Sequence, residues 1–418
     1  MGDQKARGTE SMMRNQKTEY WKQLVGVLCL GWIVIWFART MLTPVYAEVQ
    51  MTTGPQSSLR MGMIASCYFL GYTVIQIPGG MWMDRVGRKK VMIPGLAVFA
   101  AGLLLMANAR TLEMLYMGNL LAGLGTGTYY SGAFSLTGSY VVPEYKYVAT
   151  AFVNNGCAFG IMAGYLFSGY FVKKQGFSWT MPVWVDAAAV LVLLLIFIKV
   201  LKEEAPASAG RRKQKTETGP GGLFSWKMAA SCFYYFSACY GYYMMITWLP
   251  SFLEMERGMD GSKASVYACI VSLTSVPGAL LCGRFLDRFG NKNVMFMSVL
   301  QCLAAVMLLL TTRFTVVGAL MLALGLYGFL GKQAIDPLIV PYISGSVPAS
   351  RRSTVLGIFN FFGMSGSVLA PGITGYVEDL TGSKVCGFYI AVVLMFAGSV
   401  LFWLTNRTGG GLKCFTQS

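Results

Sequence analysis

Long apolar windows, separated by short polar or Gly/Pro-containing connections, dominate the pattern of hydrophobic and polar positions along this chain. A helix that crosses the hydrocarbon core of a bilayer needs about 20 mostly apolar residues. Twelve such windows can be placed, at residues 24–48, 59–82, 91–109, 112–140, 147–172, 180–200, 227–253, 264–286, 293–312, 315–341, 353–377 and 384–405. The pattern therefore predicts an all-α membrane protein with twelve transmembrane helices in two six-helix halves.

A polar connection separates the sixth window from the seventh. It contains a basic run, RRKQK from Arg211, and a Gly-Pro-Gly-Gly run, a composition typical of a flexible hydrophilic linker. We therefore predict five parts, which are a cytoplasmic N-terminal tail at 1–23, a first half at 24–201, a cytoplasmic linker at 202–226, a second half at 227–405 and a cytoplasmic C-terminal tail at 406–418.

One loop motif joins the second window to the third and recurs between the eighth and the ninth. The first copy is GMWMDRVGRKK from Gly80, and the second is GRFLDRFGNK from Gly283. In each copy we expect the first Gly to let two helices approach closely, the Asp-Arg pair to place charge where the chain leaves the lipid, and the second Gly to make the turn. Two halves with the same joint predict a membrane transporter built from two pseudo-symmetric repeats.

Composition supports a membrane protein. The chain of 418 residues is 55% hydrophobic and 12% charged, with a mean hydropathy of +0.54, so it has too few charges to cover a soluble globule of this size. The ten cysteines are scattered without CxxC spacing, which indicates free thiols rather than disulfides or zinc ligands. Histidine is absent, so any proton coupling must use a carboxylate, and we expect neither a metal nor a cofactor.

The net charge of +16 does not indicate a nucleic-acid partner, because the basic residues flank the apolar windows instead of covering one soluble face. They are dense in the loops on the side of both termini and sparser on the other side, where Arg60, Arg110 and Arg313 lie. The positive-inside rule then predicts that both termini are cytoplasmic, in the inner or plasma membrane. The apolar run from Leu24 is too long for a signal-peptide h-region, so we expect it to remain as an anchor.

These motifs resemble the major facilitator superfamily over essentially the whole chain. The first loop matches that family's signature, G-x-x-x-D-R-x-G-R-K, and the second copy has Asn291 where the first has Arg. The resemblance implies that this loop packs against the partner half and biases the outward-facing state. It assigns conformational gating to Gly80, Asp84, Arg85, Gly87, Arg88, Asp287 and Arg288. Positive-inside residues that cap a turn would lie at the same places.

Within the superfamily, the chain resembles the organic-anion branches, namely the anion:cation symporters and the organophosphate:phosphate antiporters. Three stretches support this resemblance: WFARTMLTP around Arg39, TWLPSFL from Thr247 and VPGALLCG from Val276. The chain departs from the antiporters at Tyr242, where a second Arg is expected, and from many of the symporters at Ala38, where an acid is expected.

Three charged residues are candidates for charges deep in a span, where such side chains usually face a water-filled pathway. With a rise of 1.5 Å per residue, Arg39 lies ~5 Å from the centre of its window, Lys332 ~6 Å and Asp336 ~12 Å. We expect all three to face one aqueous cavity. Arg39 is the main candidate, because a guanidinium stays protonated and its planar fork matches a carboxylate or phosphate. A structural Arg bonded to backbone carbonyls would also fit this position.

Lys332 and Asp336 are four residues apart, so they share one helix face within pairing distance. Two interpretations remain open. The pair neutralises itself, or the substrate carboxylate competes for Lys332, so that protonation of Asp336 is linked to anion binding. Pro337 follows directly and predicts a helix break that could act as a hinge.

Other residues in the windows could offer hydroxyl or amide groups to a ligand. The candidates are Tyr129, Tyr130, Tyr242, Tyr243, Asn154 and Asn360. For each, a hydrogen bond between helices is the alternative. By contrast, the spacing of Gly156, Gly160 and Gly164 predicts a stripe on which another helix packs closely, not a ligand site.

Together these features predict a secondary transporter rather than an enzyme, with a central site around which two halves rock. The expected substrate is a small organic anion, a carboxylate such as a sugar acid or dicarboxylate, held by Arg39 with help from Lys332. Transport would be coupled to a proton or a counter-anion, and not to ATP, because no Walker loop is present. We expect a monomer in the lipid bilayer. The alternatives are a transporter-like organophosphate sensor and a polyspecific drug exporter.

Overall fold

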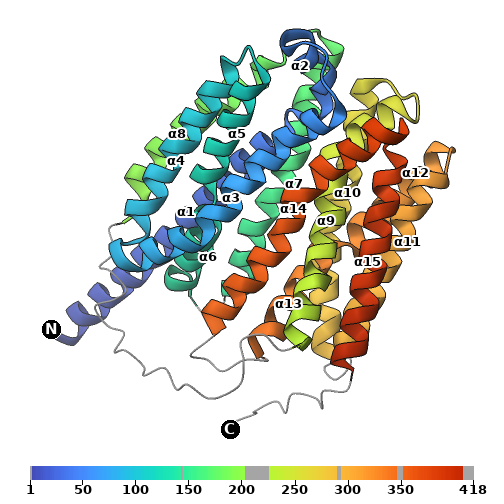
Figure 1. The fold of residues 1–418 in the computed structure, drawn as a ribbon. Coiled ribbons are helices and arrows are strands. Elements are labelled where there is room, and N and C mark those ends of the chain that lie inside the picture. Colours follow the sequence, from blue (N-terminus) through green and yellow to red (C-terminus); the bar gives the residue numbers. More distant parts are fainter. Residues whose placement is uncertain (1, 143–144, 203–225, 290–292, 346–351, 408–418) are drawn as a thin grey trace.

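The computed structural model describes residues 2–142, 145–202, 226–289, 293–345 and 352–407 (Figure 1). The predicted linker, apart from its two end residues, therefore lies outside the described residues, as does most of the predicted C-terminal tail. The helices are α1 (Gly2–Thr40), η1 (Thr43–Val45), α2 (Tyr46–Thr53), α3 (Ser58–Val86), α4 (Arg88–Ala107), α5 (Leu112–Thr126), α6 (Tyr129–Tyr140), α7 (Lys146–Phe167), η3 (Ser168–Lys174), α8 (Thr180–Val200), α9 (Trp226–Met255), α10 (Gly261–Phe289), α11 (Asn293–Arg313), α12 (Val317–Leu330), α13 (Lys332–Gly345), α14 (Arg352–Thr381) and α15 (Val385–Asn406).

Nine helical spans within the described residues are long and apolar enough to cross a membrane. The helices α5 and α6 together, α7, and α9 occupy the three remaining windows. The predicted all-α transmembrane fold is confirmed. Three windows differ in detail, because the chain breaks after Thr40, at 127–128 and at Gly331. The first of these spans continues through η1 into α2, and each of the other two consists of two helices.

The packing of helices in the first half repeats in the second. Helix α1 packs on α7 as α9 packs on α14, α3 packs on α5 as α10 packs on α12, and α4 packs on α8 as α11 packs on α15. Two helix pairs join the halves, α3 with α14 and α7 with α10. Because α3 corresponds to α10 and α14 corresponds to α7, each pair is the counterpart of the other. The two halves are therefore related by a pseudo-two-fold axis that passes between them.

The glycine stripe of α7 lies against α1, as its spacing predicts. A Cβ added at Gly156 would be 2.6 Å from the Cys29 carbonyl oxygen, and one at Gly160 would be 2.4 Å from that of Ile33. The two backbones touch, so no larger residue fits there without moving one helix. This contact fixes the position of α1 relative to α7, and with it the position of the last turn of α1.

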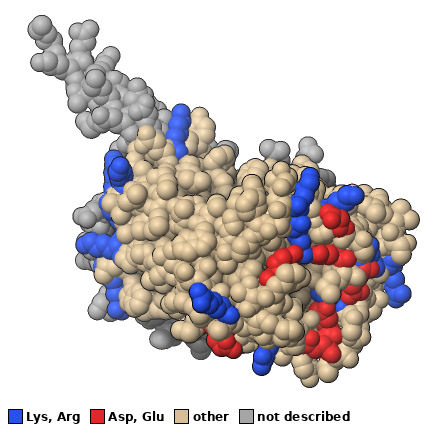
Figure 2. Space-filling view, turned by 90° about the horizontal axis from the view of Figure 1, so that it is seen from above, with Lys and Arg blue, Asp and Glu red and all other residues tan. Residues whose placement is uncertain are grey.

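We call the end of the bundle that contains α2 the α2 end, and the end where α1 begins and α15 finishes the termini end (Figure 1). At the α2 end the halves are joined by polar contacts. Lys173 Nζ of η3 lies 2.8 Å from Glu254 Oε1 of α9 and 3.1 Å from Glu48 of α2. Figure 2, viewed onto this end, shows acidic side chains gathered over one side of the face with Lys and Arg among them. The α2 end is thus held closed by contacts between the halves.

Candidate functional site

Arg39 is the penultimate residue of α1, at the point where the first span changes from helix to irregular chain. Pro44 cannot donate to the Thr40 carbonyl as the next helical residue would, and the Thr43 hydroxyl takes that place at 2.9 Å. The helix therefore ends in the middle of the span. Its C-terminal end, which carries partial negative charge, favours a cation in the last turn.

The Arg39 guanidinium lies in a cage of aromatic rings. Its Cζ is 4.3 Å from the ring centroid of Tyr72, 4.5 Å from Trp36, 5.0 Å from Tyr68 and 5.6 Å from Phe69. The side chain is only 7% exposed. Three of the four rings come from α3, on positions that follow the helical repeat.

Two donors of this guanidinium have no acceptor. Both Nε and Nη2 are buried without a hydrogen-bond partner, as is the neighbouring Trp36 Nε1, and among the described residues no carboxylate pairs with Arg39. Ring faces stabilise a desolvated cation by about 2 kcal/mol or more, which offsets much of the several kcal/mol that burying an unpaired charge costs. The rings take no hydrogen bond from Nε or Nη2, so the cage stabilises the charge and leaves two donors for an anion.

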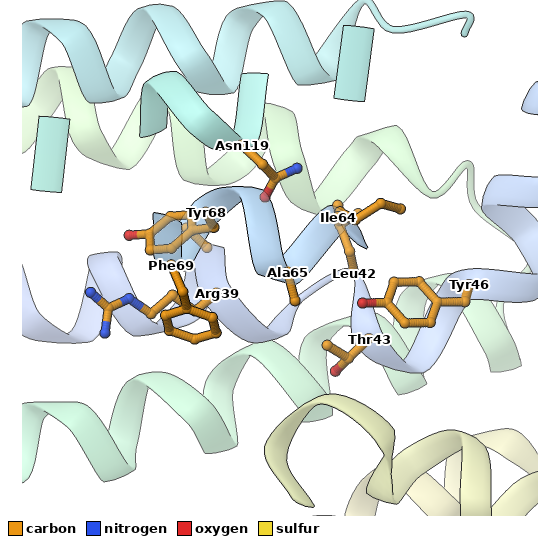
Figure 3. A pocket seen from close by; sticks show the side chains of 10 residues that line it. Arg39, Leu42, Thr43, Tyr46, Ile64, Ala65, Tyr68, Phe69 and Asn119 are labelled. Carbon is orange, nitrogen blue, oxygen red and sulfur yellow. The ribbon is translucent and has the colours of Figure 1, made fainter. Parts of the chain in front are cut away.

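A pocket lies on the α2 side of Arg39 (Figure 3). It is a small pocket lined by Ala38, Arg39, Leu42, Thr43, Tyr46, Ile64, Ala65, Tyr68, Phe69 and Asn119. In Figure 3 the guanidinium points away from Tyr46 and Thr43, which lie at the opposite side of the group. The free donors are therefore directed toward the middle of the molecule and not toward the α2 end.

Lys332 of the second half is the first residue of α13, directly after the break at Gly331. Its Nζ lies 2.7 Å from Asp336 Oδ2, and the side chain is 7% exposed. The ring centroids of Tyr235, Tyr242 and Tyr243 are 5.4, 5.8 and 6.0 Å away. The second carboxylate oxygen of Asp336, Oδ1, is buried without a partner. The predicted break at Pro337 is wrong, because α13 continues through this residue and the span breaks six residues earlier at Gly331.

Tyr243 of α9 connects the two cations. Its ring lies 4.6 Å from Phe69 and nearly parallel to Trp36 at 6.1 Å, and both of these rings touch Arg39. The same ring faces Lys332. The structure thus brings Arg39, Lys332 and Asp336 around one aromatic residue at the boundary between the halves.

The other predicted ligands divide into two groups. Tyr130 is 44% exposed and within electrostatic range of Asp336 and Lys332, so it faces the second half. Tyr129, by contrast, is buried and donates to the Leu28 carbonyl at 2.7 Å. The prediction that Tyr129 binds the ligand is wrong, because its hydroxyl holds α6 against α1.

The remaining candidates are polar residues around the same region. The Tyr242 hydroxyl accepts a hydrogen bond from Gln333 at 3.1 Å. Asn360 Nδ2 donates to Gln76 Oε1 at 2.7 Å and so joins α14 to α3. Asn154 is half-buried on α7, and within the described part of the chain its side chain forms no hydrogen bond.

Sequence reasoning missed the aromatic side of the site. Tyr68, Phe69, Tyr72 and Gln76 lie on one face of α3, and the first three surround Arg39. The signal was present in the second window, where aromatic residues recur at spacings of three and four.

The gating loop is described in part. Gly87 has φ of +94° between α3 and α4, which confirms it as the turn glycine. Gly80 was expected to allow close helix approach, and this is wrong, because a Cβ there would meet no atom within 4 Å while one at Gly79 would be 2.4 Å from Thr128. Arg85 is exposed and Arg88 is half-buried. The side chains of Asp84, Asp287 and Arg288 lie outside the described part of the structure.

Comparison with known proteins gives a consistent result. The family model described as Major Facilitator Superfamily matches residues 28–371 and 232–412. The chain is 25% identical over 361 residues to the 3-(3-hydroxy-phenyl)propionate transporter of Escherichia coli, covering 84% of this chain and 85% of that protein. It is 24% identical to the cis,cis-muconate transport protein of Acinetobacter baylyi, covering 82% and 84%. Among solved structures, a bacterial homologue of the human lysosomal transporter Spinster, inward-facing and occupied, superposes with a TM-score of 0.74 at 16% identity, over 93% of this chain and 97% of that one.

Proposed function

The chain belongs to the major facilitator superfamily of membrane transporters, and we propose that it moves a small organic anion by alternating access around the site between Arg39 and Lys332. The observation that supports this most is the state of Arg39. It is a buried guanidinium with two free donors and no carboxylate partner in the described residues. An anionic ligand would supply both the missing charge and the missing acceptors.

The surroundings favour a carboxylate on a flat apolar body over a sugar acid. Aromatic faces line both cations, whereas three of the nearby polar groups are already paired within the protein, Tyr68 with Thr126, Tyr242 with Gln333, and Asn360 with Gln76. A polyhydroxylated ligand would have to break these pairs, while an unsaturated or aromatic acid would only stack on the rings. The names of the two relatives, a hydroxyphenylpropionate and a muconate transporter, agree with this class.

For coupling, we take Asp336 as the proton-linked group. A substrate carboxylate that approaches Lys332 competes with Asp336, and its arrival is easier when Asp336 carries a proton. Exchange for a counter-anion uses the same competition without a proton. In both modes Lys332 is the shared cation, and Tyr130, Tyr242, Tyr243, Asn154 and Asn360 would line the ligand's path.

For orientation, we place the termini end in the cytoplasm of an inner or plasma membrane, with the protein acting as a monomer. In the described residues, Arg85, Arg88 and Lys89 flank the spans at the termini end, and the positive-inside rule places a concentration of such residues in the cytoplasm. The loop residues Asp84, Arg85, Gly87, Arg88, Asp287 and Arg288 would then control closure on the cytoplasmic side.

The test is counterflow in proteoliposomes preloaded with one acid and supplied with the same labelled acid outside. The panel contains aromatic acids, unsaturated dicarboxylates and sugar acids at equal concentration. We expect counterflow of a planar acid. Arg39→Ala should reduce its rate about 100-fold, because removing one member of a buried charge pair costs affinity on this scale.

Arg257→Ala is the matched control. Arg257 also lies against an aromatic ring, Phe252, but its Nη2 donates to the carbonyls of Thr311 and Thr312 at 3.0 and 2.8 Å, and its Nη1 donates to that of Glu256. Among the described residues, Nε alone of its nitrogens is buried without a partner, whereas Arg39 has two such nitrogens. This variant should keep its substrate preference. Binding of an acid by the wild type without any counterflow would show a sensor instead of a transporter, and full activity of Arg39→Ala would refute the proposed site.

A further inference from the structure

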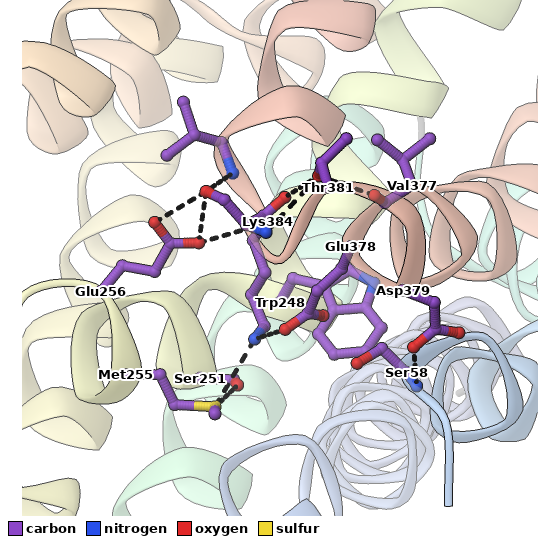
Figure 4. A network of polar contacts seen from close by, with 12 residues as sticks. Ser58, Trp248, Ser251, Met255, Glu256, Val377, Glu378, Asp379, Thr381 and Lys384 are labelled. Carbon is purple, nitrogen blue, oxygen red and sulfur yellow. Dashed lines mark hydrogen bonds and ion pairs between the residues drawn. The ribbon is translucent and has the colours of Figure 1, made fainter.

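At the α2 end, the last turn of α14 in the second half meets the first turn of α3 in the first half. The carboxylate of Asp379 spans this junction (Figure 4). Its Oδ1 accepts a hydrogen bond from the backbone N–H of Ser58 at 2.7 Å, and its Oδ2 accepts one from Leu59 at 2.9 Å. One side chain of one half therefore caps a helix of the other.

The first N–H groups of any helix have no partner inside the helix and carry partial positive charge. In α3 the N-cap Ser57 satisfies only one of them, the N–H of Arg60, at 3.3 Å. The two preceding N–H groups depend on Asp379. When the halves separate at this end, both hydrogen bonds break and the carboxylate leaves the helix terminus.

The carboxylate is held in place by the corner that follows it. The neighbouring Glu378 pairs with the buried ammonium of Lys384, and Glu256 accepts hydrogen bonds from the Ser383 hydroxyl at 2.9 Å and from the backbone N–H of Lys384 (Figure 4). These contacts lie within the second half, so they remain when the halves part. Asp379 is thus presented to α3 by a rigid turn.

The two helices pack closely beside this junction. A Cβ at Gly375 would lie 2.2 Å from the Ser58 carbonyl oxygen, and one at Gly62 would lie 2.3 Å from that of Pro371. The two helices are in backbone contact here. Opening the α2 end must therefore lift α3 off α14 as a whole.

We propose that Asp379 is a latch that stabilises the state closed at the α2 end by capping α3 across the interface between the halves. This goes beyond the proposed substrate site, because it assigns the conformational preference of the empty protein to residues far from Arg39. It holds whatever the ligand is.

Two variants remove the latch from opposite sides. Asp379→Asn removes the charge and one acceptor oxygen. Ser58→Pro removes one of the two donors and suits the backbone, because Ser58 is the first helical residue and Ser57 already has the extended conformation, φ −68° and ψ 156°, that precedes proline.

Asp260→Asn is the matched control. Asp260 also caps a helix, accepting from the N–H groups of Ser262 and Lys263 at 3.1 and 3.2 Å, but this helix is α10 of its own half. Its loss weakens a cap of similar geometry but breaks no hydrogen bond between the halves.

The measurement is the distance between two nitroxide labels at the α2 end in the full-length protein, by pulsed electron paramagnetic resonance. Met51→Cys in the first half and Val316→Cys in the second carry the labels, because these residues are 83% and 70% exposed and other reactive cysteines can be replaced by alanine. We expect Asp379→Asn and Ser58→Pro each to raise the ratio of long to short distances about threefold or more, as loss of a charge-assisted cap implies. The double variant should add little, because both remove one interaction.

Unchanged distances in both variants, or an equal shift in Asp260→Asn, would overturn the latch. Melting curves of each variant show whether it is folded. If Asp379→Asn does not fold, Ser58→Pro alone still decides the question.

Discussion

Asn360 and Gln76 join the two halves of the protein through a hydrogen bond of 2.7 Å between their side-chain amides. Gln76 lies one helical turn beyond Tyr72, which contacts Arg39. Asn360 follows Phe359, whose ring stacks at 4.6 Å on Tyr235 beside Lys332. This bond therefore crosses the boundary between the halves next to both cation sites.

The effects of replacing Gln76 and Asn360 on the melting temperature should not add up, because the two side chains form one hydrogen bond. Gln76→Met and Asn360→Leu each leave the other amide half-buried and unpaired, so each should lower the melting temperature. The double variant should lower it no further than the worse single variant, with a coupling of about 1 kcal/mol. Asn154→Leu is the control, since Asn154 forms no side-chain hydrogen bond with the described residues. Additive losses in the double variant would argue against the pair.

The ring of Tyr243 should matter more than its hydroxyl. Among the described residues, the hydroxyl donates a hydrogen bond to the sulfur of Met364, at 3.8 Å, whereas the ring packs between the Arg39 cage and Lys332. We expect Tyr243→Phe to keep anion affinity within about twofold and Tyr243→Leu to weaken it about fivefold to tenfold. Isothermal titration with the preferred acid checks this. Equal loss in both variants would show that the hydroxyl is the ligand.

Asp336→Asn should separate the two coupling modes. Without a titratable carboxylate beside Lys332, an imposed proton gradient should no longer drive accumulation, while exchange of labelled for unlabelled acid should continue within a few-fold of the wild type. Uptake and counterflow from the same proteoliposomes provide both values. If accumulation persists, the pair at Lys332 and Asp336 is not the coupling site, and if both fail together it is a structural pair.

Gly160→Ala should destabilise the protein and disturb Trp36. The new methyl group would lie 2.4 Å from the Ile33 carbonyl oxygen and 2.7 Å from Trp36 Cβ, so α7 must move away from α1 at a cost of about 1–3 kcal/mol. Gly138→Ala, where a Cβ meets nothing within 4 Å, should be neutral or slightly stabilising. Thermal unfolding of both variants tests the difference, and equal melting temperatures would contradict the packing argument.

The sequence contains enough information to predict the membrane fold and its division into halves. Length and polarity of each window decide whether it crosses a bilayer, and the repeated loop from Gly80 and Gly283 shows the duplication directly. The stripe from Gly156 to Gly164 likewise predicted a close contact, because only glycine allows two backbones to touch.

The site was less predictable, because it depends on which faces of different spans meet. Intramembrane charge identified Arg39, Lys332 and Asp336, but nothing local shows that the aromatic face of α3 surrounds Arg39. Tyr129 and Tyr130 are adjacent in sequence, yet one hydroxyl bonds to a carbonyl and the other ring faces the second half. The break at Gly331 was missed because proline is the stronger local signal, and Pro337 fits within α13.

The most direct test of the central claim, that Arg39 binds the negative charge of the substrate, compares a planar carboxylic acid with its uncharged carboxamide. Their dissociation constants are measured by titration on the wild type, Arg39→Ala and Arg257→Ala. We predict that the wild type and Arg257→Ala bind the acid at least about 30-fold more tightly, and that this preference falls to about threefold or less in Arg39→Ala. An undiminished preference for the acid in Arg39→Ala would contradict the account.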